Sequence, residues 1–160
     1  MSLAKKLFLL FLLLLTGLVL YTLISTGFFR TVENRSEGEV IKEISLKGAE
    51  DITVSAEDSF ALISATDRLE FPAPEQEQGG LYLMELKSGN FNIKHLTSGF
   101  SSPFAPHGIS MIRTDSTYTI AAINHTAEGH TIEFFSLYGE TLTHTRTHRS
   151  SWLISPNDIV

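Results

Sequence analysis

The stretch that decides the fold class runs from residue 130 to residue 144. It reads His130-Thr131-Ile132-Glu133-Phe134-Phe135-Ser136-Leu137-Tyr138, then Gly139-Glu140, then Thr141-Leu142-Thr143-His144. The first nine residues are rich in β-branched and aromatic side chains, which favour strands. Gly139-Glu140 is a two-residue turn signal, and a returning strand follows it. The sequence therefore predicts a β-hairpin.

Short runs of the same kind lie N-terminal to this hairpin. Each is apolar or alternating, which is typical of β-strands, and no long helical pattern occurs after the first thirty residues. The runs predict strands at 40–46, 59–65, 80–86 and 118–123, with residues 72–80 as a surface loop without chemistry.

This pattern predicts an all-β chain and leaves a sandwich, a barrel and a propeller open. A propeller blade takes four strands and about 40 to 45 residues. The roughly 130 residues after the N-terminal segment would then amount to about three blades.

The N-terminal segment is apolar. Residues 7–29 are 23 uncharged, Leu-rich residues, and as a helix they would span roughly 35 Å, enough for a bilayer core. The run is longer than that of a cleavable signal peptide, which favours an uncleaved signal anchor. Lys5 and Lys6 precede it and only Arg30 follows closely, so the rest of the chain should be extracytoplasmic. We divide the chain into a transmembrane anchor (1–30), a linker (31–38) and a β-rich part (39–160).

Composition excludes several functions. The formal charge of −6 has no basic cluster beside it, which argues against a nucleic-acid partner. The chain has no cysteine, so disulfides, thiolate metal sites and a cysteine nucleophile are excluded. Neither a Gly-x-Ser-x-Gly elbow nor a Gly-rich phosphate loop occurs. Any hydrolysis must therefore use a metal or water.

Two pairs of oxygen-bearing side chains stand at expected strand entrances. Glu50-Asp51 and Asn157-Asp158 each precede a β-branched residue. Neighbours in extended backbone point to opposite sides, so one pair can offer one oxygen to each of two sites. Such oxygens are ligands of calcium, which takes about six to eight of them. From spacing alone, a role as turn residues explains both pairs better.

Two histidines form a second candidate cluster. His107 opens one expected strand and His125 closes another, although each taken alone is better explained as a structural histidine. A zinc site is not supported, because two histidines four apart in a strand are about 13 Å apart and no helical metalloprotease motif is present. The remaining histidines are predicted to be solvated strand residues: His95, His130, His144 and His148.

Five short segments are informative when they are considered together and in their order along the chain. They are Gly48-Ala49-Glu50-Asp51, Ser59-Phe60-Ala61-Leu62-Ile63-Ser64, Pro106-His107-Gly108-Ile109-Ser110, Asn124-His125 and Pro156-Asn157-Asp158-Ile159-Val160. Together, over about residues 45–160, they resemble the paraoxonase/arylesterase family. The resemblance implies a six-bladed β-propeller with two calcium ions in its tunnel, of which this chain holds about three blades. It also implies hydrolysis of lactones and aryl esters, and an N-terminal apolar anchor is common in the family.

The resemblance also implies metal ligands. Glu50 and Asn157 resemble ligands of a catalytic calcium. The structural calcium would be held by Asp51, Asp158 and the backbone carbonyl of Ile109.

His107 and His125 fall on the family's proposed histidine dyad. His107 would deprotonate the attacking water and His125 would orient and polarise it. Calcium would polarise the substrate carbonyl and stabilise the developing oxyanion.

The chain departs from the family pattern in its extent. The family's other catalytic-calcium ligands belong to later blades, so calcium binding should be weak. The ring-closing disulfide of animal members is impossible without cysteine, and an open half-propeller would expose a strand edge. We therefore expect a fragment, a truncated product or one of two chains that complete a ring, inactive in isolation.

The expected partners are a small ester or lactone and, through the N-terminal helix, a membrane. The main alternative function is a membrane-tethered, non-enzymatic binding module derived from a β-propeller. A second alternative keeps the propeller and acts on sugar lactones.

Overall fold

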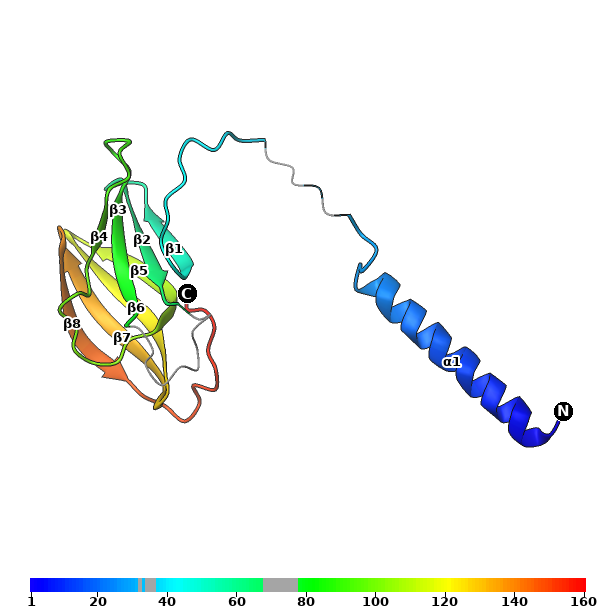
Figure 1. Cartoon of the computed structure of the whole chain (residues 1–160). Helices are drawn as coiled ribbons and strands as arrows, with labels where there is room; N and C mark the ends of the chain where they lie inside the picture. Colours follow the sequence, from blue (N-terminus) through cyan, green and yellow to red (C-terminus); the bar gives the residue numbers. More distant parts are fainter. Residues whose placement is uncertain (32, 34–36, 68–77) are drawn as a thin grey trace. The chain divides into compact units, whose positions relative to one another are not determined.

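The computed structural model describes residues 1–31, 33, 37–67 and 78–160 (Figure 1). These residues divide into two compact units, Met1–Glu43 and Ile44–Val160. Most of the predicted loop 72–80 and the middle of the predicted linker 31–38 lie outside the described residues.

The N-terminal unit contains one helix, α1 (Leu3–Ser25). This helix is apolar and long enough to cross a membrane, which suits a membrane anchor or a signal sequence. It begins and ends earlier than the predicted span of 7–29, and Gly27 follows it with a φ of 72°, a backbone conformation that ends helices. The orientation of the helix across a membrane remains a prediction.

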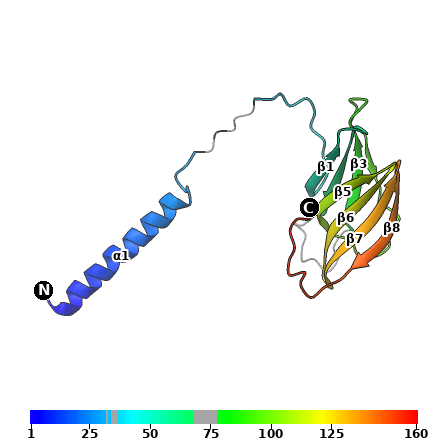
Figure 2. The same ribbon diagram turned by 180° about the vertical axis from the view of Figure 1, so that it is seen from behind.

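The second unit contains two antiparallel sheets of four strands each. Every strand pairs with the next one in the sequence, in the orders β1-β2-β3-β4 and β5-β6-β7-β8 (Figures 1 and 2). The first sheet consists of β1 (Ala49–Ser55), β2 (Phe60–Ala65), β3 (Gly80–Glu85) and β4 (Ile93–His95). The second consists of β5 (Pro106–Thr114), β6 (Thr117–Thr126), β7 (Gly129–Tyr138) and β8 (Thr141–His148).

The predicted hairpin is confirmed. Tyr138 pairs with Thr141 across a two-residue turn. Gly139 has a φ of 58° in that turn, and a side chain would strain this conformation. The prediction held because turn chemistry and strand propensity are both local in this stretch.

Other strand predictions were less accurate. Residues 40–46 form no strand, and Val40 and Ile41 are largely exposed. Residues 157–160, expected to begin a strand, are irregular as well. A strand needs a partner, and no described strand pairs with either segment.

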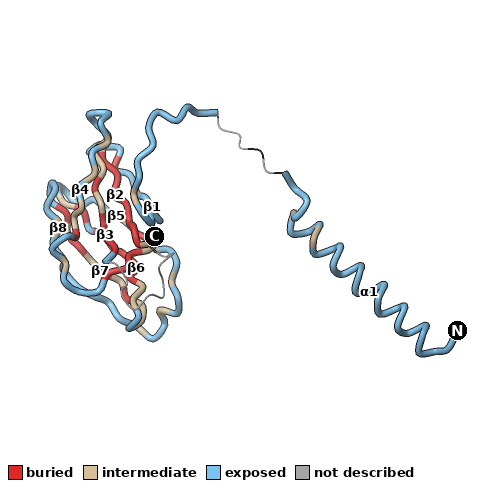
Figure 3. Tube along the Cα trace, viewed as in Figure 1, coloured by how far each residue is buried: buried red, intermediate tan, exposed pale blue. Residues whose placement is uncertain are grey.

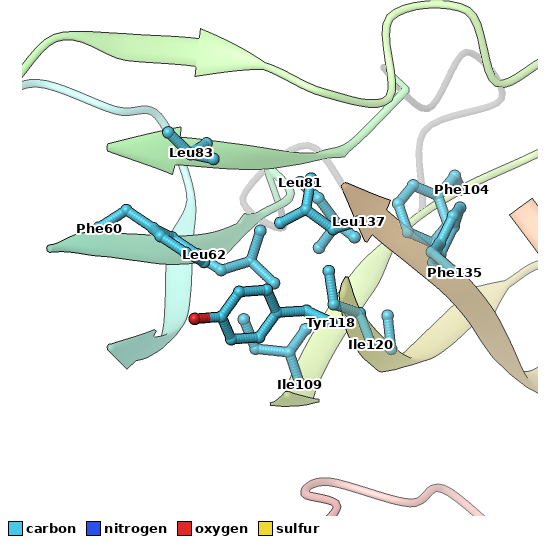
Figure 4. Packing of buried hydrophobic residues seen from close by; sticks show 11 residues of the cluster. Phe60, Leu62, Leu81, Leu83, Phe104, Ile109, Tyr118, Ile120, Phe135 and Leu137 are labelled. Atoms are coloured by element: carbon cyan, nitrogen blue, oxygen red, sulfur yellow. The ribbon is translucent and has the colours of Figure 1, made fainter. Parts of the chain in front are cut away.

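The two sheets pack against each other through one apolar core (Figure 4). Leu62 and Leu81 of the first sheet and Ile120 and Leu137 of the second are completely buried in it. Each such side chain stabilises the fold by roughly 1.5 to 3 kcal/mol relative to exposure. Burial is concentrated in the middle strands, whereas β8 is mostly exposed (Figure 3). The unit is thus all-β, and its two four-stranded meanders are consistent with part of a propeller.

Truncating the core should destabilise this unit measurably. Leu62→Ala removes a fully buried side chain and should lower the free energy of unfolding by about 2 to 5 kcal/mol. Urea unfolding of the detergent-solubilised chain measures this change. Ile52→Ala is the matched control, because Ile52 on β1 is 54% exposed and should cost about 1 kcal/mol or less. Equal losses for both variants would contradict the described core.

Candidate functional site

The residues predicted for the site come from four segments that meet at one end of the sheets. Glu50 and Asp51 lie near the start of β1, His107 lies near the start of β5, and His125 lies near the end of β6. The fourth segment is the C-terminal stretch, which ends beside β1 and β5 (Figures 1 and 2). The structure therefore brings together residues up to 108 positions apart in sequence.

A β-bulge interrupts each of the two strand starts. In β1 the register shifts between Ala49 and Asp51, which leaves Glu50 as the extra residue. In β5 the shift lies between Pro106 and Ile109 and includes His107. A bulge leaves backbone groups without ladder partners and turns a side chain out of the regular alternation.

Ser64 of β2 connects the two bulges. Its hydroxyl accepts a hydrogen bond from the Asp51 N–H, at 3.2 Å, and donates one to the His107 carbonyl, at 2.6 Å. Ser64 is completely buried, so these backbone groups have this hydroxyl as partner in place of water. The position of the Glu50-Asp51 pair is thereby tied to that of His107.

His107 lies between the two residues predicted to hold a catalytic calcium. Its Nε2 is 2.6 Å from Oδ1 of Asn157, and its Nδ1 is 3.0 Å from Oε1 of Glu50. The contact with Glu50 has the distance of an ion pair without the direction of a hydrogen bond. The His107 side chain is only 16% exposed, so bulk water reaches a small part of the ring.

The side chain of Asp51 contacts other groups than the side chain of Glu50 does. Its Oδ2 accepts a hydrogen bond of 2.8 Å from the Ile109 N–H, and its Oδ1 accepts one from the Ile52 N–H. The two neighbouring carboxylates therefore contact different groups, whereas their expected service to two metal sites stays a prediction. Asp51 and Ile109, both predicted for a structural calcium, are in contact.

Gly108 allows the C-terminal segment to approach β5. A Cβ atom at this position would lie 2.7 Å from the Asn157 carbonyl oxygen and 2.7 Å from the Asp158 Cα. It would also lie 3.1 Å from Oδ1 of Asp158. Distances this short exclude a side chain, so a glycine is needed where Asn157-Asp158 packs on the bulge.

The second predicted histidine is fixed in orientation and has a third one beside it. His125 Nε2 is 2.6 Å from the Pro156 carbonyl oxygen, and the His125 ring lies 5.2 Å from the His107 ring. The ring of His130 on β7 lies 4.4 Å from His125 on its other side. His130 was predicted to be solvated, but its Nδ1 is buried without a hydrogen-bond partner. Opposite pairing of these residues across β6 and β7 explains the contact.

The other three histidines were predicted to be solvated strand residues, and the prediction fits them to different degrees. His148 is exposed. His144 contacts a buried carboxylate described below. His95 stacks on Tyr82 at 4.5 Å, and burial lowers the pKa of His95 below its ordinary value.

The assembled donors fit calcium in kind. They are carboxylate, amide and backbone carbonyl oxygens, the hard ligands that calcium takes. They fall short in number, because each predicted ion would receive at most two side chains from this set. Among residues 1–31, 33, 37–67 and 78–160, no group of three or more His, Asp or Glu side chains is placed to hold a metal ion. Calcium at this site is therefore a proposal that further oxygen donors would have to complete.

A comparison with protein families decides the classification. A family model described as Arylesterase matches residues 29–160, which include all eight strands and every predicted site residue. The chain belongs to the arylesterase family. A search of curated proteins found no match.

One buried carboxylate of this arylesterase-family chain was missed in the sequence. Glu133 of β7 is only 3% exposed and contacts Asn124, the residue before His125. Its Oε1 accepts hydrogen bonds from Thr131 and Asn124, and its Oε2 accepts them from His144 and Thr147. The alternation of β7 held the signal, because Glu133 has the same parity as the buried residues Phe135 and Leu137.

These contacts set the charge of Glu133. Burial alone would raise its pKa, but the hydrogen bonds from Thr131, Thr147, His144 and Asn124 together lower the pKa below its ordinary value. Glu133 is therefore a carboxylate at neutral pH, and its charge is compensated by four donors.

Gly108→Ala should displace the C-terminal segment from β5, because the new Cβ would meet backbone atoms. Amide chemical shifts of Asn157 and Asp158 in the ¹⁵N-labelled, detergent-solubilised chain report this displacement. Gly99→Ala is the matched control, since nothing lies within 4 Å of a Cβ at position 99. Unchanged shifts in Gly108→Ala would show that the segment does not pack on the bulge.

Glu133→Gln should lower the free energy of unfolding by about 1 to 3 kcal/mol at neutral pH, because one accepting oxygen becomes an NH₂ group that faces hydrogen-bond donors. The pKa of Glu133 is lowered in the folded state. Its contribution is therefore fully present above the ordinary pKa of about 4.3 and is lost as the pH falls through the lowered value. Urea unfolding from pH 7 to pH 3 should show the difference from wild type shrinking at the acid end. Glu57→Gln, at a side chain 73% exposed, should change little. A difference that stays constant down to pH 3 would contradict the assignment.

Proposed function

We propose that the β-rich part of this chain belongs to a six-bladed, calcium-dependent propeller that hydrolyses lactones and aryl esters. The observation that carries the proposal is the position of His107 between Glu50 and Asn157 in a chain of the arylesterase family. In this proposal each of the two sheets would be one blade, so the described residues would hold two blades where chain length predicted about three. The hydrolysis in this proposal is metal-assisted, as the resemblance to the family implies, and it uses neither a cysteine nor a serine-elbow nucleophile.

In this proposal His107 is the general base. Nε2 faces the amide oxygen of Asn157 and therefore carries a proton, so Nδ1 is the atom that takes the proton of the attacking water once Glu50 has turned toward its ion. The carboxylate of Glu50, 3.0 Å from Nδ1 in the structure, offsets the positive charge that the ring gains. The water oxygen forms the new bond to the carbonyl carbon, and the phenolate or alkoxide leaves with the electrons of the broken ester bond. The proton on His107 is then available to the leaving group.

His125 orients and polarises the attacking water beside His107. The Pro156 carbonyl accepts a hydrogen bond from the Nε2–H of His125, which fixes the tautomer and direction of the ring. The rings of His107 and His125 lie edge to face, with an angle of 84° between their planes.

The remaining site residues would hold the ions. Glu50 and Asn157 would be ligands of the catalytic calcium, and Asp51, Asp158 and the Ile109 carbonyl would be ligands of the structural one. Bound calcium would polarise the ester carbonyl and offset the negative charge that develops on its oxygen.

The proposal includes a membrane tether and an assembly. α1 would anchor the chain with the sheets on the extracytoplasmic side, according to the flanking lysines. Ile52 and Val54 of β1 and Ile112 of β5 are more than half exposed, which suits packing against further blades. These blades would come from additional polypeptide, including a second chain.

If the detergent-solubilised chain completes its site by self-association, it should hydrolyse phenyl acetate or a simple δ-lactone when calcium is present. Turnover should disappear on chelation and return when calcium is added back. His107→Gln should lower kcat by about 100-fold or more, because the general base is removed. His148→Gln is the control, since His148 is exposed on β8 and belongs to neither site.

Turnover that survives chelation would exclude a calcium role and contradict the proposal. A wild-type chain that turns over neither substrate, even with calcium, would show that the chain does not complete the site by itself, as a fragment or as the membrane-tethered binding module. Turnover by the chain supplied with the missing blades, lost in His107→Gln, would exclude the binding module, whereas no turnover there would contradict the enzymatic function.

A further inference from the structure

The segment that leads into β5 is attached to β6 by a side chain. Regular pairing of the two strands begins at Pro106 and is interrupted at once by the bulge. Upstream of Pro106, Oδ1 of Asn124 accepts the Ala105 N–H at 2.8 Å, and Nδ2 of Asn124 donates to the Pro103 carbonyl at 3.0 Å. The Ala105 carbonyl accepts the His125 N–H at 3.0 Å. One amide thus replaces the missing ladder bonds.

The surroundings determine the direction of this amide. Nδ2 of Asn124 faces two acceptors, the Pro103 carbonyl and Oε1 of Glu133, whereas Oδ1 faces the Ala105 N–H. A flipped amide would place its oxygen against two acceptors and its NH₂ group against a donor. Glu133 remains charged and is fixed by three other side chains, so it favours only the observed direction.

The same segment is fixed on its other side. Gln78 donates to the Ser102 carbonyl at 2.6 Å and accepts the Phe104 N–H at 3.1 Å. The Thr66 hydroxyl donates to the Pro106 carbonyl at 3.0 Å. Hydrogen bonds therefore fix the backbone of residues 102–106 on two sides. Asn124 makes those on the β6 side.

The two histidines of the site depend on this arrangement. His125 directly follows Asn124, and its N–H is bonded to Ala105. His107 stands two residues after Ala105. Asn124 is 3% exposed and Ala105 is 1% exposed, so water cannot easily replace the amide as a partner.

We propose that Asn124 is a positioning residue for the His107–His125 pair and that Glu133 orients its amide. The role of the pair in hydrolysis rests on the proposed function, whereas the positioning itself does not. Loss of the amide would leave the Ala105 N–H and the Pro103 carbonyl without partners. The segment would then shift, and the spacing of the two rings would change with it.

Hydrogen exchange in the unaltered chain gives a first test. The amides of Ala105 and His125 should exchange as slowly as that of Ile120 in the core, although Ala105 lies outside any strand. Exchange as fast as at the exposed residue Ser101 would overturn the proposal. This measurement needs no variant, so it remains decisive if a variant fails to fold.

The second test uses Asn124→Ala in the ¹⁵N-histidine-labelled, detergent-solubilised chain. Ring ¹⁵N and ¹H shifts of His107 and His125 should both change, while those of His148 stay constant. Thr147→Val is the matched control, because Thr147 bonds to Glu133 and has no bond to residues 103–105. Unchanged rings in Asn124→Ala, or equal changes in Thr147→Val, would overturn the positioning role.

Kinetics separate this proposal from the proposed function. If the chain hydrolyses phenyl acetate, Asn124→Ala should lower kcat about tenfold or more with KM nearly unchanged, because the reacting groups lose alignment. A large rise in KM with unchanged kcat would count against positioning. A wild-type chain without turnover would bear on the proposed function alone, since the ring shifts still decide the role of Asn124.

Discussion

The hydroxyl of Ser64 is the interaction on which the arrangement of the site depends. Two bulges release backbone groups from the sheet ladders, and this one buried side chain accepts from the first bulge and donates to the second. Unsatisfied groups in such a place would cost about 1 to 3 kcal/mol each. The acidic pair of β1 and the histidine of β5 are therefore held in contact by a residue that has no chemical role itself. The apolar core stabilises the two sheets, and the hydrogen bonds at the end of the core fix the positions of the site residues.

Much of the fold could be predicted because its determinants are local. The hairpin at 130–144 combines strand-forming residues with a turn glycine, and both act over a few residues. Strand alternation also predicted different partners for Glu50 and Asp51, although the bulge at Glu50 departs from that alternation. The strand predicted at 40–46 was wrong, because alternation in sequence does not show whether a partner strand is present.

The contacts within the site were beyond such reasoning. Which residue becomes extra in a bulge depends on the pairing of two strands, and here the extra residues include Glu50 and His107. His130 was misjudged because its position opposite His125 follows from the register of β6 and β7. Glu133 was detectable by parity, yet its four partners come from three strands and only the folded chain shows them. The family resemblance located the candidate residues, and the structure added the groups that hold them.

The two outer edges of the sheets have a consequence for the behaviour of the chain in a crowded cell. β4 is only three residues long, and β8 is an exposed strand with Thr141, Thr143, Thr145 and Thr147 along its length. Short or polar edges are poor templates for the addition of a foreign strand. Of the exposed large apolar side chains on described strands, Ile52 and Val54 lie on β1 and Ile112 lies on β5, the first strand of each sheet, while Tyr138 ends β7. Packing of another polypeptide is thus favoured on β1 and β5. Growth of fibres by strand addition at β4 and β8 is disfavoured.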